Sequence, residues 1–172
     1  MALEQRLRMA ELQGAVDELY SAHNEKRKTV AEDLKLILLS DIKDFFLSKG
    51  FSIQETRNGL LGTFHGLKLT VEIPDDEKEY FGQDFYMTVC LDKTNLDLAV
   101  LLLTERTPDF MGKPDDIDGK ITFYEQTLIP ALHERGVSDI SAGKYVIKAA
   151  YSYDKTERRR FNNVADVLNE ML

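Results

Sequence analysis

Hydrophobic residues in the first 49 positions of the chain repeat at helical spacing. At about 100° per residue they fall within one stripe roughly 100° wide, made of Met9, Leu12, Val16, Leu19, Val30, Leu34, Ile37, Leu38 and Phe45. Neither glycine nor proline occurs between Ala15 and Lys49. The stripe also keeps its phase across the polar block 23–28. The pattern therefore predicts one long helix, or a helical hairpin, over residues 1–49.

A single helix of this length would leave hydrophobic surface that a compact domain does not cover. Residues 15–49 alone would span about 50 Å at 1.5 Å per residue. A compact chain of this size has a diameter of roughly 40 Å. We therefore expect the segment to pair with a second copy or to dock a larger protein. The expected partner-binding residues are Leu12, Val16, Leu19, Val30 and Leu34, with His23 as a polar break in the seam.

Alternating apolar and polar residues follow the helical segment, around two short turns. Asn58-Gly59 and His65-Gly66 are typical of two-residue hairpin turns. The first turn pairs Ile53 with Phe64, and the second pairs Phe64 with Leu67. Both turns place the same side chains on one face, namely Phe51, Ile53, Leu60, Phe64, Leu67, Leu69, Val71 and Ile73. This agreement predicts a three-stranded antiparallel meander.

Further strands are expected where the alternation returns, over 85–91 and 144–153. The run 96–104 is short and apolar throughout, which fits a strand covered on both faces, with a helix as the alternative. A helix is predicted over 117–132, with Pro130 kinking it or weakening its last turn.

A final helix is predicted to begin at Asp154. Asp154 and Glu157 have the spacing of a capping pair at a helix N-terminus. The apolar residues behind them would lie on one helical face, namely Phe161, Val164, Leu168 and Met171.

The order of these elements predicts an α+β fold. It has a long N-terminal helix and an antiparallel meander sheet of four to six strands, one face of which is covered by two further helices. Residues 1–49 would be the interaction segment and residues 50–172 the globular domain. No run reaches the roughly 20 apolar residues that span a bilayer, so no membrane partner is expected. The single cysteine, Cys90, cannot form an internal disulfide, which predicts a cytoplasmic location.

A basic cluster near the C-terminus stands against a net charge of −8. It consists of Lys144, Lys148, Arg158, Arg159 and Arg160. These residues favour an alternative function, an accessory subunit that binds nucleic acid or a phosphate ligand, with Tyr151 or Tyr153 available to stack on a base. Three successive helical residues point about 100° apart, however, and the acidic body repels a polyanion. Nucleic acid is therefore not the expected partner.

Candidate catalytic chemistry is sparse. The three histidines, His23, His65 and His133, do not have the spacing of a metal-binding helix. Asp116, Asp118 and Glu125 match part of a calcium-loop pattern, but proline occupies its first ligand position. No metal or cofactor is expected. The sequence favours a non-enzymatic interaction or assembly subunit, and an enzyme of unrecognised type is the second alternative.

Overall fold

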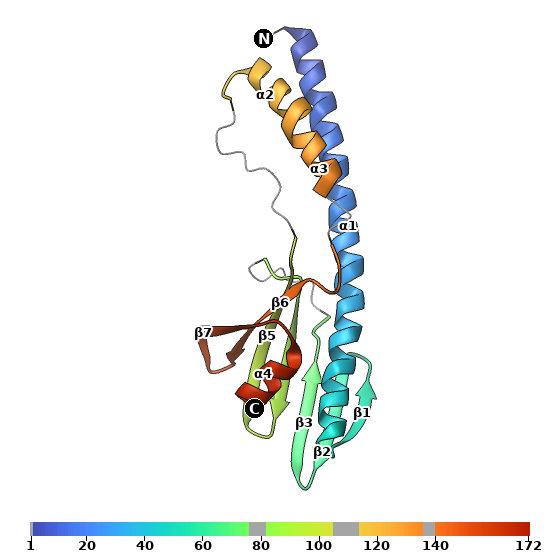
Figure 1. The fold of residues 1–172 in the computed structure, drawn as a ribbon, viewed down its shortest axis with the longest axis vertical. Coiled ribbons are helices and arrows are strands. Elements are labelled where there is room, and N and C mark those ends of the chain that lie inside the picture. The colour runs from blue at the N-terminus through green and yellow to red at the C-terminus, as the bar shows by residue number, and fades with distance from the viewer. Residues whose placement is uncertain (1, 76–81, 105–113, 136–139) are drawn as a thin grey trace. The chain divides into compact units, whose positions relative to one another are not determined.

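The structure is a computed structural model that describes residues 2–75, 82–104, 114–135 and 140–172. Its fold class is α+β, as the sequence predicts (Figure 1). The first helix, α1, runs without interruption over Leu3–Ser48, so this segment is one helix and not a hairpin. The chain divides into two compact units that cut across the boundary expected at residue 49. Unit 1 consists of Met1–Thr29 and Thr104–Ser141, and unit 2 of Val30–Leu103 and Ala142–Leu172.

Unit 1 packs the first part of α1 against a second helical segment. That segment comprises α2 (Ile117–Phe123), a π-helical turn η1 (Tyr124–Leu128) and α3 (Ile129–Arg135). Pro130, which is expected to kink the helix, lies two residues after the end of the π-helical turn. Proline donates no hydrogen bond, and its ring crowds the carbonyl four residues earlier. The turn widens here, and the amide of Ile129 bonds to the carbonyl of Tyr124, five residues back.

Unit 2 is built on a sheet of seven strands, more than the four to six that the sequence predicts. Every neighbouring pair is antiparallel, and the strands follow one another in chain order. They are β1 (Ser52–Thr56), β2 (Gly59–Phe64), β3 (Leu67–Glu72), β4 (Phe85–Leu91), β5 (Thr94–Leu102), β6 (Tyr145–Tyr151) and β7 (Asp154–Phe161). The ambiguous run 96–104 is therefore a strand, since it supplies most of β5.

The second hairpin has its predicted register, and the first is offset by two residues. Phe64 pairs with Leu67, as predicted. Ile53 pairs with Gly62 instead of Phe64, so the first turn is formed by Arg57-Asn58. Because side chains alternate with a period of two, an offset of two leaves them on the predicted face.

Gly59 is the reason for this offset. It is the first residue of β2 and not part of the turn. A Cβ at this position would lie 1.7 Å from the carbonyl oxygen of Val71 on β3. Glycine is therefore required for the close approach of two backbones, and the Asn58-Gly59 dipeptide does not act as the turn signal that it resembles.

Helices cover one face of the sheet, which we call the covered face. The second part of α1 buries Val30, Leu34, Leu38, Ile42 and Phe46, and α4 (Val164–Met171) buries Val164, Val167, Leu168 and Met171. Lys43 of α1 donates to Glu55 of β1 (2.6 Å), and the Tyr151 hydroxyl of β6 donates to the Met171 carbonyl (3.2 Å). The opposite face, which we call the open face, exposes polar side chains that include Gln54, Thr63, Lys68 and Lys148.

The segment that begins at Asp154 is a strand and not the predicted start of a helix. Asp154 accepts hydrogen bonds from the amide and the hydroxyl of Thr156 (3.1 and 2.6 Å). This is a turn at the β6–β7 hairpin, which uses the same short-range bonding as a helix cap. The last helix begins later, with Asn163 as its cap, whose side chain accepts from the amide of Asp166 (2.9 Å).

Candidate functional site

In unit 1 the expected partner-binding residues are largely buried by the chain itself. Leu12 and Val16 form the core of this unit together with Tyr124, Leu128 and Leu132. Leu19 packs against the edge of that core, and His23 is half-buried. The hydrophobic stripe of α1 therefore has its partner in cis, in the helical segment from α2 to α3.

The remaining two expected partner-binding residues lie in unit 2 and are also buried. Val30 and Leu34 are 7 % and 0 % exposed, respectively, and belong to the core beneath the sheet. The sequence pattern identifies a stripe that must be covered, but the covering groups come from this chain. A surface for a partner has to be sought among residues that stay exposed.

The first turns of α1 carry a second stripe that remains exposed. Leu3 and Leu7 are 70 % and 57 % exposed, although both are large hydrophobic residues. Ala10 and Gly14 continue the stripe and are also exposed, and a Cβ at Gly14 would meet nothing within 4 Å. The spacing of four, three and four residues is that of the a and d positions of a coiled coil. We call Leu3, Leu7, Ala10 and Gly14 the exposed stripe.

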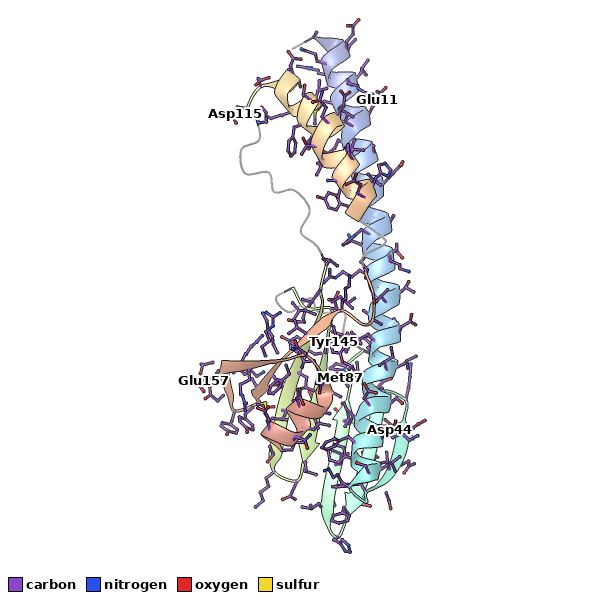
Figure 2. The ribbon with its side chains drawn as sticks, viewed as in Figure 1. Glu11, Asp44, Met87, Asp115, Tyr145 and Glu157 are labelled. Carbon is purple, nitrogen blue, oxygen red and sulfur yellow. The ribbon has the colours of Figure 1, made fainter. Side chains whose placement is uncertain are left out.

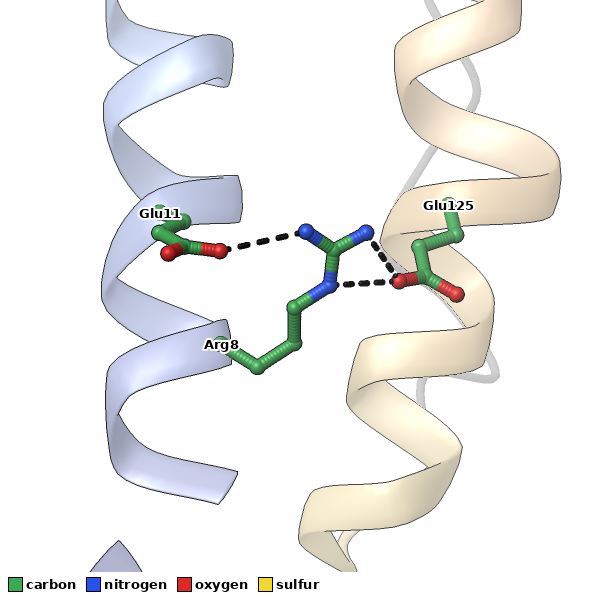
Figure 3. Close-up of polar contacts among 3 residues, drawn as sticks. All are labelled: Arg8, Glu11 and Glu125. Atoms are coloured by element: carbon green, nitrogen blue, oxygen red, sulfur yellow. Dashed lines mark hydrogen bonds and ion pairs between the residues drawn. The ribbon is translucent and has the colours of Figure 1, made fainter. Parts of the chain in front are cut away.

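Arg8 joins the two helical segments of unit 1 beside this stripe (Figure 3). Its Nε donates to Oε1 of Glu125 in η1 (2.8 Å), and a second guanidinium nitrogen lies 2.6 Å from the same oxygen. Its third nitrogen lies 3.2 Å from Glu11, one turn along α1. Hydrogen bonds to Glu125 and Glu11 raise the pKa of the Arg8 guanidinium above its ordinary value. These contacts fix the rotation of α1 against η1.

The carboxylates of the partial calcium-loop pattern also stabilise the contact between α1 and the helical segment from α2 to α3. Asp116 caps α2 by accepting from the amide of Gly119 (2.7 Å). Asp118 accepts from the side chain of Gln5 (2.7 Å), and Glu125 accepts from Arg8 as described. These three carboxylates are thus engaged in capping and in contacts between the helices.

The predicted basic cluster is divided between the two faces of the sheet. Arg158, Arg159 and Arg160 lie on β7, the strand that Glu157 marks in Figure 2. Successive residues of a strand point to opposite faces. Arg160 pairs with Lys148 of β6 on the open face, whereas Arg159 pairs with Ala149 on the covered face. Lys144 precedes β6 by one residue.

The basic residues of this hairpin differ in whether a carboxylate neutralises them. Lys155 lies 3.3 Å from Asp97 of β5. Arg159 forms an ion pair with Glu170 of α4, and its guanidinium lies over the ring of Phe161. Among the residues that the structure describes, Lys148, Arg158 and Arg160 make no ion pair. We call these three the open basic cluster.

The two tyrosines that are expected to stack on a base lie on the other side of this hairpin. Tyr151 points to the covered face, where its hydroxyl bonds to Met171. Its ring stacks on that of Tyr153, with centroids 5.4 Å apart. Among the described residues, the aromatic side chain that the strand pairing places on the open face is Tyr86 of β4, which is half-buried. The sequence could have identified Tyr86 from the alternation of β4, had the order of strands been known.

Within the described ranges, the chain offers little to catalysis. No group of three or more His, Cys, Asp or Glu side chains is placed to hold a metal ion there, and no polar or charged residue in those ranges is buried. A hollow of about 430 Å³ lies over β1 to β3 and is lined by side chains such as Gln54, Thr63 and Lys68. No described helix combines the length and the apolar character that crossing a membrane requires.

The chain matches no known protein family, no curated protein and no solved structure. Its candidate sites therefore rest on their own geometry, which offers the exposed stripe of α1 and the open basic cluster of β6 and β7.

Proposed function

We propose that this protein is a non-enzymatic assembly subunit that pairs with a second copy of itself through the exposed stripe of α1. The observation that carries the proposal is the exposure of Leu3 and Leu7, two leucines one helical turn apart. Burying a leucine side chain contributes about 1.5–3 kcal/mol. Leaving both in water forgoes that contribution unless another surface covers them.

In its described residues, unit 1 contains fewer helical segments than a usual helical bundle, which supports the packing of a further helix from a partner. Its core contains five buried residues contributed by two helical segments. Helical bundles usually pack three or four helices, so that each helix buries more than one of its sides. A further helix against the exposed stripe would give α1 a second packed side. Ala10 and Gly14 would let the backbones approach closely at that contact.

Charges beside the exposed stripe support a parallel pair of α1 helices. If Leu7 and Gly14 are a positions, Glu4, Glu11 and Glu18 are e positions and Arg6 is a g position. In a parallel pair each g residue meets the e residue five positions later on the partner helix, so Arg6 meets Glu11. An antiparallel pair would bring e positions together and set glutamates against glutamates. Electrostatics therefore favours the parallel arrangement.

The stripe is short, so the proposed association is weak and reversible. It contains two leucines per copy and ends before Asp17, which occupies the next d position. Interfaces below about 1,200 Å² belong to transient complexes. Association of this kind depends on protein concentration, and it must be measured over a concentration series.

Sedimentation velocity over such a series tests the proposal. The weight-average sedimentation coefficient of the wild type is expected to rise with concentration. Leu7→Glu places a charge in the seam and should abolish the rise. Leu36→Glu is the matched control, because Leu36 is 69 % exposed on α1 but lies outside the stripe, in unit 2. A wild type that stays monomeric, or equal effects of the two variants, would contradict self-association.

A further inference from the structure

The open basic cluster combines like charges in a geometry that costs stability. Lys148 and Arg160 are directly opposite each other on β6 and β7. Cβ atoms of such cross-strand pairs lie about 4.5–5.5 Å apart, and like charges at this distance destabilise a sheet. Arg158 is exposed and lies two residues before Arg160, where the pairing between β6 and β7 shifts its register. Two cations thus lie opposite each other on the open face, with a third two residues away on β7, in a chain whose net charge is −8.

Neutralisation elsewhere on the same hairpin makes the cluster distinctive. Lys155 and Arg159 belong to the same strand, and each has a carboxylate from a neighbouring element. Residues 142–172 carry six basic and four acidic side chains, a net charge of +2. The segment therefore has carboxylates, but in the described structure they do not pair with the cluster.

Protection of the sheet edge does not by itself account for the cluster. β7 is the last strand of the sheet, and edge strands often carry charged residues that prevent pairing with other chains. That role needs charge on β7, but it does not need a cation opposite Arg160 on β6. An acidic residue at position 148 would leave the protecting charges of β7 in place and would stabilise the strand pair. The like charge at Lys148 calls for another explanation.

We propose that the open basic cluster binds the phosphate backbone of a single-stranded nucleic acid. Lys148 and Arg160 pair across the two strands, with Cβ atoms about 4.5–5.5 Å apart. Two cations at this separation can contact one phosphate from both sides. A bound phosphate between Lys148 and Arg160 would convert their repulsion into two charge-assisted contacts. The acidic remainder of the chain repels a polyanion and restricts binding to this patch.

The row of side chains across the open face favours nucleic acid over other polyanions. Tyr86 of β4, Ala99 of β5, Lys148 of β6 and Arg160 of β7 follow one another in register. Strands are about 4.8 Å apart, so Tyr86 lies about 10 Å from Lys148, with a small side chain between them. A base attached to a phosphate at the cluster can span this distance to the tyrosine ring, passing above the neighbours that leave Ala99 only 2 % exposed. Stacking on an aromatic ring is open to any base.

Each contact has a distinct signature in this arrangement. Phosphate contacts release counterions and make the affinity depend on salt, by a log–log slope of about 0.7 per contact for a single strand. Stacking on Tyr86 adds affinity without a salt dependence. Phosphate contacts and stacking on an aromatic ring do not distinguish one base from another, so the sequence preference should be slight. The site is independent of the exposed stripe of α1, and either proposal can fail alone.

Fluorescence anisotropy with a labelled oligothymidylate, measured on the full-length chain over a salt series, tests this inference. The wild type is expected to bind with a salt-dependent affinity. The double variant Lys148→Ala, Arg160→Ala removes two cations that bind phosphate. It should lower the log–log slope by about 1.4, or about 0.7 for each of the two. Tyr86→Leu should weaken binding and leave the slope unchanged.

Two controls separate the site from general charge. Lys155→Ala, Arg159→Ala removes the same charge from the same hairpin but from neutralised positions, and it should leave the slope nearly unchanged. An equal reduction of the slope in both double variants would overturn the proposal, as would undetectable binding by the wild type at low salt. Full displacement of the oligonucleotide by an equal phosphate concentration of anionic lipid vesicles would reassign the patch to a membrane surface and would also overturn it.

Discussion

Lys148 on β6 lies directly opposite Arg160 on β7, and both side chains are exposed on the open face of the sheet. Opposite charges are favourable at this position, so a like-charged pair is a local departure from what stability alone would select. Such departures are expected where a surface serves a ligand. The pair exists because β6 and β7 are neighbours in the sheet, and it forms the centre of the proposed anion site.

Charge reversal at Arg160 should therefore stabilise the fold while it removes the site. Arg160→Glu places a carboxylate opposite Lys148, and we expect the free energy of unfolding to rise by about 0.2–1 kcal/mol. Urea denaturation measures the change. Lys155→Glu serves as a control, because it breaks the contact with Asp97 and should not stabilise. A less stable Arg160→Glu variant would show that the cross-strand repulsion has no cost.

The buried face of the meander allows a second prediction. Leu69 of β3 is 1 % exposed on the covered face, whereas the neighbouring Lys68 is exposed on the open face. Leu69→Ala should lower the free energy of unfolding by about 2–5 kcal/mol, because it leaves a cavity in a packed core. Lys68→Ala should have a far smaller effect in the same denaturation experiment. Equal effects would mean that both faces of β3 are buried.

The sequence predicts a strand of this sheet only where apolar and polar side chains alternate along it. In β3 one face is buried and the other is wet, so a period of two is visible and the second hairpin is predicted in register. In β7 the residues from Lys155 to Arg160 are all exposed, so no apolar alternation marks the strand. The bonds from Thr156 to Asp154 then resemble a helix cap, and the helix predicted there is wrong.

For the long helix α1, the sequence predicts the helix but not which side of it is buried along its whole length. Its buried positions in unit 2 recur every four residues, from Val30 to Phe46. Four residues advance by about 400°, so the buried side rotates by about 40° at each step. A stripe drawn at fixed phase therefore includes the exposed Ile37 and misses Ile42 and Phe46. The helix itself is predictable from its pattern, but the path of its buried side depends on the surface beneath it.

The candidate sites were predictable only in part, because each depends on pairing between distant segments. The arginine run is visible in the sequence, but a strand in place of a helix is what sets Arg160 opposite Lys148. On α1 both stripes are apolar, and the sequence does not reveal that α2 to α3 cover Leu12 and Val16 and leave Leu3 and Leu7 exposed.

A third prediction concerns the dependence of stability on pH. The hydrogen bond and charge of Lys43 lower the pKa of Glu55 below its ordinary value. A carboxylate with a lowered pKa stabilises the fold at pH values above the pKa of the unfolded chain, about 4.3. That contribution is lost as the pH falls through the lower pKa of the folded state.

Glu55→Gln tests this dependence. The variant should be slightly less stable than the wild type at neutral pH, and the difference should vanish as the solution is acidified through the range below about pH 4.3. Thermal unfolding at a series of pH values measures it, with Glu72→Gln on the open face as the control. A difference that grows on acidification would contradict the assigned role of Lys43.

The most direct test of the proposed assembly is disulfide cross-linking through Leu7→Cys in a Cys90→Ser background. In a parallel pair the two copies of residue 7 face each other across the seam, within reach of a disulfide. Mild oxidation should then produce a covalent dimer, and Lys26→Cys, on another side of the same helix, should produce little under identical conditions. Equal yields at the two positions, or no dimer from Leu7→Cys, would contradict the pairing of α1 helices through the exposed stripe.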